Sequence, residues 1–214
     1  MKQDAAYIAV VLDRSGSMEA VKEATIDGIN EFIKQQQAIP GDCRFFLAQF
    51  DDIYEVVYDS LLADVKPFTA LTYMPRGMTA LNDAIGKTIN SVGETLKSIP
   101  EADRPGRIVV AIITDGHENH SKEFTQAKVA EMVKHQQDVY KWNFIFIGAN
   151  QDAVLTAKQY HIDGSQAATY SGSATGTTNV MAAMACNVSG FRSAPRADSS
   201  KIKWSKQQRS SAMA

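Results

Sequence analysis

The sequence has little cysteine and no long apolar run. Its 214 residues include two cysteines, Cys43 and Cys186, too few for the disulfide framework of a small secreted domain. No segment approaches the roughly 18 consecutive apolar residues that a membrane-spanning helix needs. The apolar run Tyr7–Leu12 is too short for a signal peptide, and Asp13 follows it at once. We therefore expect a cytoplasmic protein with no membrane partner, in which both cysteines are buried free thiols.

The chain also carries little net charge, and that charge is unevenly distributed. Its formal net charge of −2 is too small for strong attraction to nucleic acid or to a membrane surface. Residues 191–214 contain six basic residues and one acidic residue, so this segment carries +5 and the remainder carries −7. The hydrophobic fraction of 44% is typical of a soluble globular domain. We therefore predict one domain over residues 1–190, followed by a basic, flexible tail over residues 191–214.

Short β-rich runs alternate with segments of helical periodicity along the chain. The β-rich runs predict strands at residues 7–12, 43–50, 53–58, 108–114, 143–147 and 167–170. Apolar residues at helical spacing predict helices at residues 19–37, 80–96, 121–137, 151–160 and 178–188, with Ser121 as the N-cap of the third. A tight turn after the second strand makes the third strand antiparallel to it. The alternation predicts an α/β fold with a doubly wound, mainly parallel sheet, one antiparallel edge strand and helices on both faces.

Oxygen-bearing side chains follow two of the predicted buried strands and begin one of the helices. Asp13, Ser15 and Ser17 follow the first strand in the segment DRSGS, and Asp115 follows the fourth strand. In parallel sheets, ligands bind beyond the carboxyl ends of the strands, so these side chains are predicted to lie close together. Thr79, in RGMTALND, adds a hydroxyl at the start of a helix. Carboxylates and hydroxyls are ligands of hard cations, which predicts a site for Mg²⁺, Mn²⁺ or Ca²⁺.

These segments resemble the metal-ion-dependent adhesion site of von Willebrand factor A domains. That site combines an Asp-x-Ser-x-Ser segment, a Gly-x-Thr loop and a Thr-Asp-Gly segment, which occur here in the same order as Asp13–Ser17, Gly77–Thr79 and Thr114–Gly116. The resemblance covers about residues 5–190 and implies the Rossmann-like fold of that family. With neither a signal peptide nor a disulfide framework, the chain looks more like small intracellular bacterial or viral members than like secreted adhesion proteins.

The resemblance also implies a role for each predicted ligand. Ser15 and Ser17 would bind the metal through their hydroxyls, and Thr79 would bind it directly or through water. Asp13 and Asp115 would act largely through water or as acceptors behind the ligands. A cation held mostly by neutral oxygens keeps much of its charge, so an open position favours the Asp or Glu carboxylate of a partner. The sequence therefore predicts a protein-binding module that uses a divalent cation, with Mg²⁺ as the first expectation.

Two other functions stay open on the sequence. The chain could be a structural or assembly protein whose basic tail docks on neighbouring proteins or on nucleic acid. It could also be a Mg²⁺-dependent hydrolase, but the sequence has no Gly-rich phosphate loop, paired catalytic carboxylates or nucleophile–base arrangement. We therefore expect a binding protein rather than an enzyme.

The remaining polar segments have simpler interpretations. The segment His117–His120 (HENH) does not have the spacing of the zinc motif HExxH. It is predicted to be a polar loop beside the metal face, in which Glu118 and Asn119 could contact a partner. Asp51–Asp52 is interpreted as a turn pair, and Asp83 as a charge in the first turn of a helix.

Overall fold

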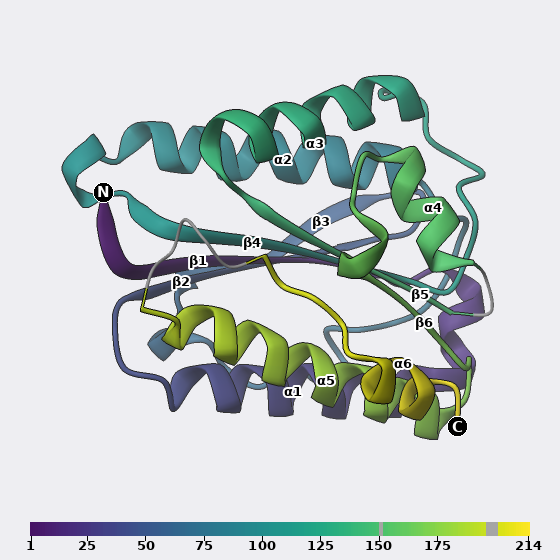
Figure 1. The fold of residues 1–214 in the computed structure, drawn as a ribbon. Helices are drawn as coiled ribbons and strands as arrows, with labels where there is room; N and C mark the ends of the chain where they lie inside the picture. The colour runs from purple at the N-terminus through teal and green to yellow at the C-terminus, as the bar shows by residue number, and fades with distance from the viewer. Residues whose placement is uncertain (150–151, 196–200) are drawn as a thin grey trace.

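The computed structural model describes residues 1–149, 152–195 and 201–214, which form a six-stranded sheet with helices on both faces (Figure 1). The strand order is β3-β2-β1-β4-β5-β6; β3 is antiparallel to β2, and all other neighbouring strands are parallel. The strands are β1 (Lys2–Asp13), β2 (Cys43–Phe50), β3 (Tyr54–Leu61), β4 (Pro105–Thr114), β5 (Asn143–Ala149) and β6 (Ala167–Tyr170). The predicted doubly wound α/β architecture, including the antiparallel edge strand, is therefore confirmed.

The helices form two layers that sandwich the sheet (Figure 1). One layer contains α1 (Lys22–Gln37), α5 (Ala174–Ser193) and the short α6 (Lys206–Ala212). The other layer contains α2 (Leu81–Ser98), α3 (Gln126–Tyr140) and α4 (Ala153–Gln159). Short 3₁₀ helices lie at Gly16–Val21, Leu62–Asp64, Glu101–Asp103 and Gly164–Gln166. None of the helices in the described part of the chain is long and apolar enough to cross a membrane.

The central strand β1 is buried on both faces, which explains its unbroken apolar run. Ile8, Val10 and Leu12 pack toward α1 and α5, whereas the alternate residues pack toward α2. Because side chains alternate between the faces, a slip of one residue would exchange these two sets, so the pairing register is strongly specified. In this register Asp13 pairs with Phe50 of β2, and Leu12 pairs with Ile113 of β4. The loops that follow these three strands therefore start at the same level of the sheet.

The C-terminal segment differs from the predicted flexible tail. Helix α5 continues to Ser193, past the predicted boundary at residue 190, and residues 201–214 pack on the domain. Ile202 and Trp204 are buried in the core on the α1 and α5 side, and the Trp204 indole donates a hydrogen bond to the carbonyl of Gln166. The segment has too few apolar residues to fold alone, but these few suffice to cover a core surface that already exists. Residues 196–200 of the predicted tail lie outside the described residues.

Two local predictions also need correction. The third helix begins at Gln126 and is capped by Thr125, whose hydroxyl accepts a hydrogen bond from the Lys128 amide, so Ser121 is not its N-cap.

The second correction concerns the cysteines. Cys43 is a buried free thiol as predicted, whereas Cys186 is a free thiol exposed on α5. Helix periodicity alone did not show which face of α5 is exposed, because that helix is rich in small residues on all sides.

Candidate metal centre

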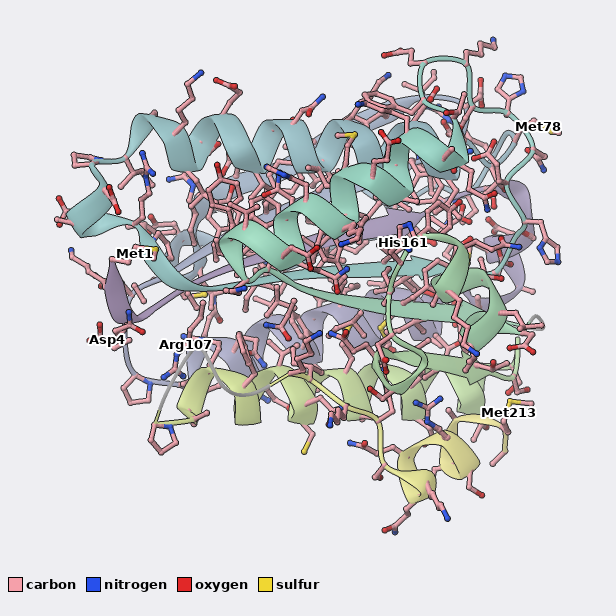
Figure 2. All side chains as sticks on the ribbon, turned by 45° about the horizontal axis from the view of Figure 1, so that its top comes forward. Met1, Asp4, Met78, Arg107, His161 and Met213 are labelled. Atoms are coloured by element: carbon pink, nitrogen blue, oxygen red, sulfur yellow. The ribbon has the colours of Figure 1, made fainter. Side chains whose placement is uncertain are left out.

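Three loops meet at the carboxyl end of the sheet. We call residues 13–17 the first loop, residues 75–80 the second loop and residues 114–121 the third loop. The Gly16 amide donates to the Gly77 carbonyl (3.3 Å), which joins the first loop to the second. The Asn119 amide donates to the Thr79 carbonyl (3.0 Å), which joins the third loop to the second. Met78 of the second loop marks this end of the molecule in Figure 2.

The loops bring hydroxyl and carboxylate oxygens together, as the sequence predicts. The Ser15 and Ser17 hydroxyls lie 3.2 Å apart, and the Ser17 hydroxyl donates to Asp115 Oδ1 at 2.7 Å. The buried Thr79 hydroxyl lies against Gly116, where an added Cβ would come within 2.9 Å of Thr79 Oγ1. A glycine at position 116 therefore leaves room for the threonine. Of these oxygen-bearing side chains, Ser17 is exposed and Asp115 is partly exposed, so the cluster opens to solvent on their side.

Asp13 lies beneath this cluster and is fully buried. Its Oδ1 accepts the Ser15 amide at 2.6 Å, and its Oδ2 accepts the Thr114 hydroxyl at 2.6 Å. Burial and, to a smaller extent, the negative charge of Asp115 raise the pKa of Asp13, the hydrogen bonds from Thr114 and Ser15 lower it, and the resulting pKa is about 6. Asp13 thus holds the backbone of the first loop, and its charge is poorly solvated.

Asp115 is the second carboxylate of the cluster. Burial raises its pKa, and the hydrogen bond from Ser17 lowers it. The basic residue of the first loop, Arg14, does not neutralise these two acids, because its guanidinium pairs with Asp51 and Glu55 instead. Two partly desolvated carboxylates whose negative charges influence each other favour a cation near them.

The spacing of the oxygens fits a small hard cation. Mg²⁺ binds oxygens at about 2.0–2.1 Å in octahedral geometry, which puts adjacent ligands about 2.9 Å apart. The separations of 2.7 Å and 3.2 Å that involve the Ser17 hydroxyl bracket this value. Within residues 1–149, 152–195 and 201–214, no group of three or more His, Cys, Asp and Glu side chains has metal-binding geometry. A cation at this place would therefore depend on the hydroxyls as well as on the carboxylates, a donor set typical of hard cations.

The third loop also holds the start of α2, a role that sequence reasoning missed. The amide of Thr79 donates to Asn119 Oδ1 at 2.9 Å, and the amide of Asn82 donates to Glu118 Oε2 at 2.8 Å. The N-cap of α2 is Ala80, which has no side-chain acceptor, so the first amides of this helix need acceptors from elsewhere. The available signal was Ala80, which directly precedes Leu81 and has no side-chain acceptor for the first amides of the helix. Glu118 and Asn119 are thus used within the chain.

Asp83 has a similar structural role rather than acting only as a helix charge. Its carboxylate accepts the backbone amides of three consecutive residues of the connection to α3, namely Lys122, Glu123 and Phe124. The Asp83 amide in turn donates to the Ser121 hydroxyl at 3.0 Å. These contacts fix the third loop against α2 and so hold Thr79 beside Gly116.

No protein-family model matches the sequence, and no curated protein matches it. Solved structures do resemble it. Proximal thread matrix protein 1 from the mussel byssus, described with a zinc-occupied MIDAS motif, is 17% identical with a TM-score of 0.58, over 87% of this chain and 46% of that chain. A von Willebrand factor type A structure from Catenulispora acidiphila is 14% identical with a TM-score of 0.58, over 86% and 43% of the two chains. The pilus adhesin SpaC from Lactobacillus rhamnosus GG is 12% identical with a TM-score of 0.66, over 88% and 31%.

These similarities define the class of fold. The chain spans less than half the length of each of the three structures. At identities of 12–17% the likeness concerns the fold alone, and the fold is that of a von Willebrand factor A domain, as the sequence predicts.

Proposed function

We propose that this chain is a metal-dependent protein-binding module. The hydroxyls of Ser15, Ser17 and Thr79 would hold a divalent cation, with Asp13 and Asp115 acting largely through water or as acceptors. Mg²⁺ is the first candidate, and Mn²⁺ and Ca²⁺ are alternatives. The observation that carries the proposal is the convergence of oxygens from the first and third loops at separations of 2.7–3.2 Å, with the Thr79 hydroxyl of the second loop against Gly116.

The chemistry of the donor set explains why such a site would bind a partner. When bound, the cation would supply a positive charge that neutral hydroxyl ligands leave largely uncompensated. Ser17 is exposed, whereas Asp13, Ser15 and Thr79 are buried, so a partner reaches the cluster from the Ser17 side. An Asp or Glu carboxylate of the partner would suit this position, because it carries a compact negative charge on oxygen.

The comparisons support the coarser part of this proposal. The mussel protein is described with a zinc-occupied MIDAS motif, and the Lactobacillus protein is described as a pilus adhesin. Both descriptions concern proteins with this fold that bind a metal or act as adhesins. They favour a binding role over catalysis for the present chain, and we propose no enzymatic activity.

The alternative of an assembly protein with a docking tail has less support. Arg192 and Arg209, two of the basic residues after position 190, are engaged within the domain. Arg192 donates to the Gln36 carbonyl at 2.6 Å, and Arg209 donates to the carbonyls of Gly164 and Ser165 at 2.9 Å and 3.1 Å. A segment fastened in this way is less available to neighbouring proteins or nucleic acid.

Metal titration of matched serine variants tests the proposal. Mn²⁺ binding would be measured by electron paramagnetic resonance for the wild type, for Ser17→Ala and for the control Ser98→Ala, which removes an exposed hydroxyl at the end of α2. We expect Ser17→Ala to bind Mn²⁺ at least about tenfold more weakly and Ser98→Ala to bind it like the wild type. Equal affinity of all three proteins, or no binding by the wild type at millimolar Mn²⁺, would contradict the proposal.

A further inference from the structure

Asp51 connects two of the three loops of the candidate centre. It is the first residue after β2, and its side chain is fully buried. Its Oδ2 accepts a hydrogen bond from Arg14 Nε of the first loop at 3.0 Å and from Arg76 Nε of the second loop at 3.0 Å. One carboxylate oxygen therefore joins loops that are separated by about sixty residues of sequence.

The backbone around Asp51 strengthens this connection. The Asp51 carbonyl accepts the Ala80 amide at 3.0 Å, next to Thr79, and the amide of Arg76 donates to the Arg14 carbonyl at 2.7 Å. The second loop also packs closely on the turn after β2. Gly77 has a positive φ of 68°, and an added Cβ there would overlap the side chain of Asp52.

Stability alone is a weak reason to bury such a cluster. Removing a carboxylate and a guanidinium from water is costly, and apolar replacements of buried ion pairs are often at least as stable. Charge-assisted hydrogen bonds are, however, short and directional, so they fix geometry well. Arg14 precedes Ser15, and Arg76 lies three residues before Thr79. A shift of either arginine therefore moves a hydroxyl of the candidate centre.

We propose that Asp51 is a positioning residue for the metal centre. By holding Arg14 and Arg76 to one oxygen, it sets the distance between the Thr79 hydroxyl and the two serine hydroxyls. The inference rests on the proposed function. It assigns to the turn between β2 and β3 a part in metal affinity that the three sequence segments of the site do not include.

Mn²⁺ affinity tests this role with a matched control. Asp51→Asn keeps the shape of the side chain and removes its charge, whereas Glu55→Gln removes the other acidic partner of Arg14 without contacting the second loop. We expect at least about tenfold weaker Mn²⁺ binding for Asp51→Asn and less than about twofold change for Glu55→Gln. If Asp51→Asn does not fold, Arg76→Gln replaces it, because the Arg76 side chain is 54% exposed and its loss leaves the Asp51–Arg14 pair intact.

A double-variant cycle separates positioning from general destabilisation. If Asp51 acts by placing Thr79, Asp51→Asn or Arg76→Gln should weaken Mn²⁺ binding little further in a Thr79→Ala background. If either change only loosens the fold, its effect should add to that of Thr79→Ala. Additive effects, or wild-type affinity in both Asp51→Asn and Arg76→Gln, would overturn the proposal.

Amide hydrogen exchange provides a reading that does not depend on metal. Without metal, Asp51→Asn or Arg76→Gln should accelerate exchange at Gly16, Arg76 and Ala80, whose amides make the contacts around this cluster, and Glu55→Gln should not. If the wild type binds no Mn²⁺, the proposed function fails, and unchanged exchange would then also reject Asp51 as the residue that positions the loops. If the wild type binds Mn²⁺ and the variants behave like it, the inference about Asp51 alone fails.

Discussion

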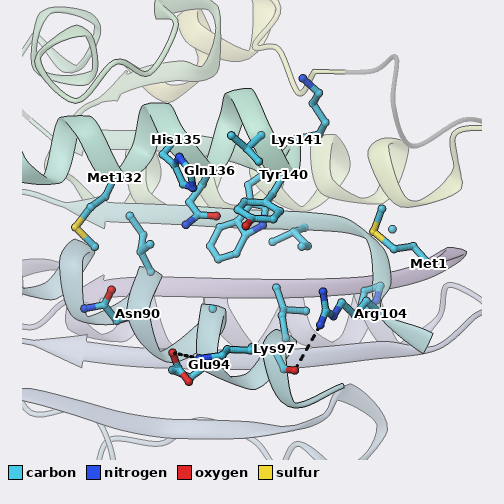
Figure 3. A pocket seen from close by; sticks show the side chains of 18 of the residues that line it. Met1, Asn90, Glu94, Lys97, Arg104, Met132, His135, Gln136, Tyr140 and Lys141 are labelled. Carbon is cyan, nitrogen blue, oxygen red and sulfur yellow. Dashed lines mark hydrogen bonds and ion pairs between the residues drawn. The ribbon is translucent and has the colours of Figure 1, made fainter. Parts of the chain in front are cut away.

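The two ends of the sheet differ in shape and in chemistry. A cavity of about 910 Å³ lies at the amino end, between the C-terminal parts of α2 and α3, with Ile108 and Trp142 among its lining residues (Figure 3). The carboxyl end instead gathers oxygens from three loops. Cavity volume therefore favours one end as a binding site, and the arrangement of polar groups favours the other.

The polar groups at the two ends are satisfied in different ways. Around the cavity, Lys97 pairs with Glu94 at 3.7 Å, and Arg104 donates to the Ile99 carbonyl at 2.9 Å, so these side chains interact within one short stretch of chain. At the carboxyl end, Ser17 bonds to Asp115 across 98 residues of sequence. Contacts that bring distant loops together need a specific fold, and we give them more weight than cavity volume as a sign of function.

Removing both serine hydroxyls should produce the largest loss of Mn²⁺ affinity. It tests directly whether metal binds at the carboxyl end of the sheet rather than at the amino end. We expect Ser15→Ala/Ser17→Ala to weaken Mn²⁺ binding at least about a hundredfold, because loss of even a supporting partner typically costs about 10–100-fold. Lys97→Ala, at the cavity end, should bind Mn²⁺ like the wild type. The measurement is an isothermal titration of each protein at equal concentration. A larger loss of Mn²⁺ affinity in Lys97→Ala than in the serine variant would mean that the metal binds at the amino end of the sheet.

Chelation should show whether the carboxyl end supports binding or folding. The sheet has an apolar core on both faces that includes none of the proposed ligands, so we expect a cooperative thermal transition in chelator. Mg²⁺ at 100 times its Kd adds about 2.7 kcal/mol, which for a chain of this size raises Tm by about 5–10 °C. Circular dichroism melts with Mg²⁺ and with chelator measure this shift. Loss of secondary structure in chelator would mean that the cation is structural.

Thr79 should distinguish partner binding from metal binding. The N-cap of α2 is Ala80, so Thr79→Ala removes no helix cap, and we expect a change of Tm of only a few degrees. The change should weaken capture of an acidic partner more than it weakens Mn²⁺ binding, and Thr79→Ser should keep most of both. Affinity capture from cell extract with Mg²⁺ or chelator supplies the partner for the comparison. Partner binding by Thr79→Ala at wild-type strength would remove Thr79 from the site.

The strand ends were predictable from sequence because their signals are local. The apolar run before Asp13 and the run before Asp115 each predict a buried strand, and parallel topology then places both carboxylates at one edge. The role of Asp51 was not predictable, because its two arginine partners belong to separate loops and only the folded chain brings them together. The packing of Trp204 was missed for the same reason, since a lone aromatic residue in a basic segment shows no periodicity.

The smallest expected effect is that of metal on the chemical labelling of the two cysteines. It tests whether the two ends of the sheet behave independently. Cys186 is exposed and should react with a maleimide within minutes at pH 8, whereas Cys43, buried at the start of β2, should not. Burial raises the pKa of the Cys43 thiol, the charge of Arg192 lowers it only in part, and the resulting pKa is about 11. At pH 8 only about one Cys43 in a thousand would be a thiolate even if it were reached by the reagent.

Because Cys43 lies at the amino end, far along β2 from the candidate centre, its slow labelling should be the same with Mg²⁺ and with chelator. Mass spectrometry of the labelled protein would show one adduct in both conditions. A second adduct that forms only in chelator would mean that metal loss opens the far end of the sheet, and the two ends would then have to be treated as coupled.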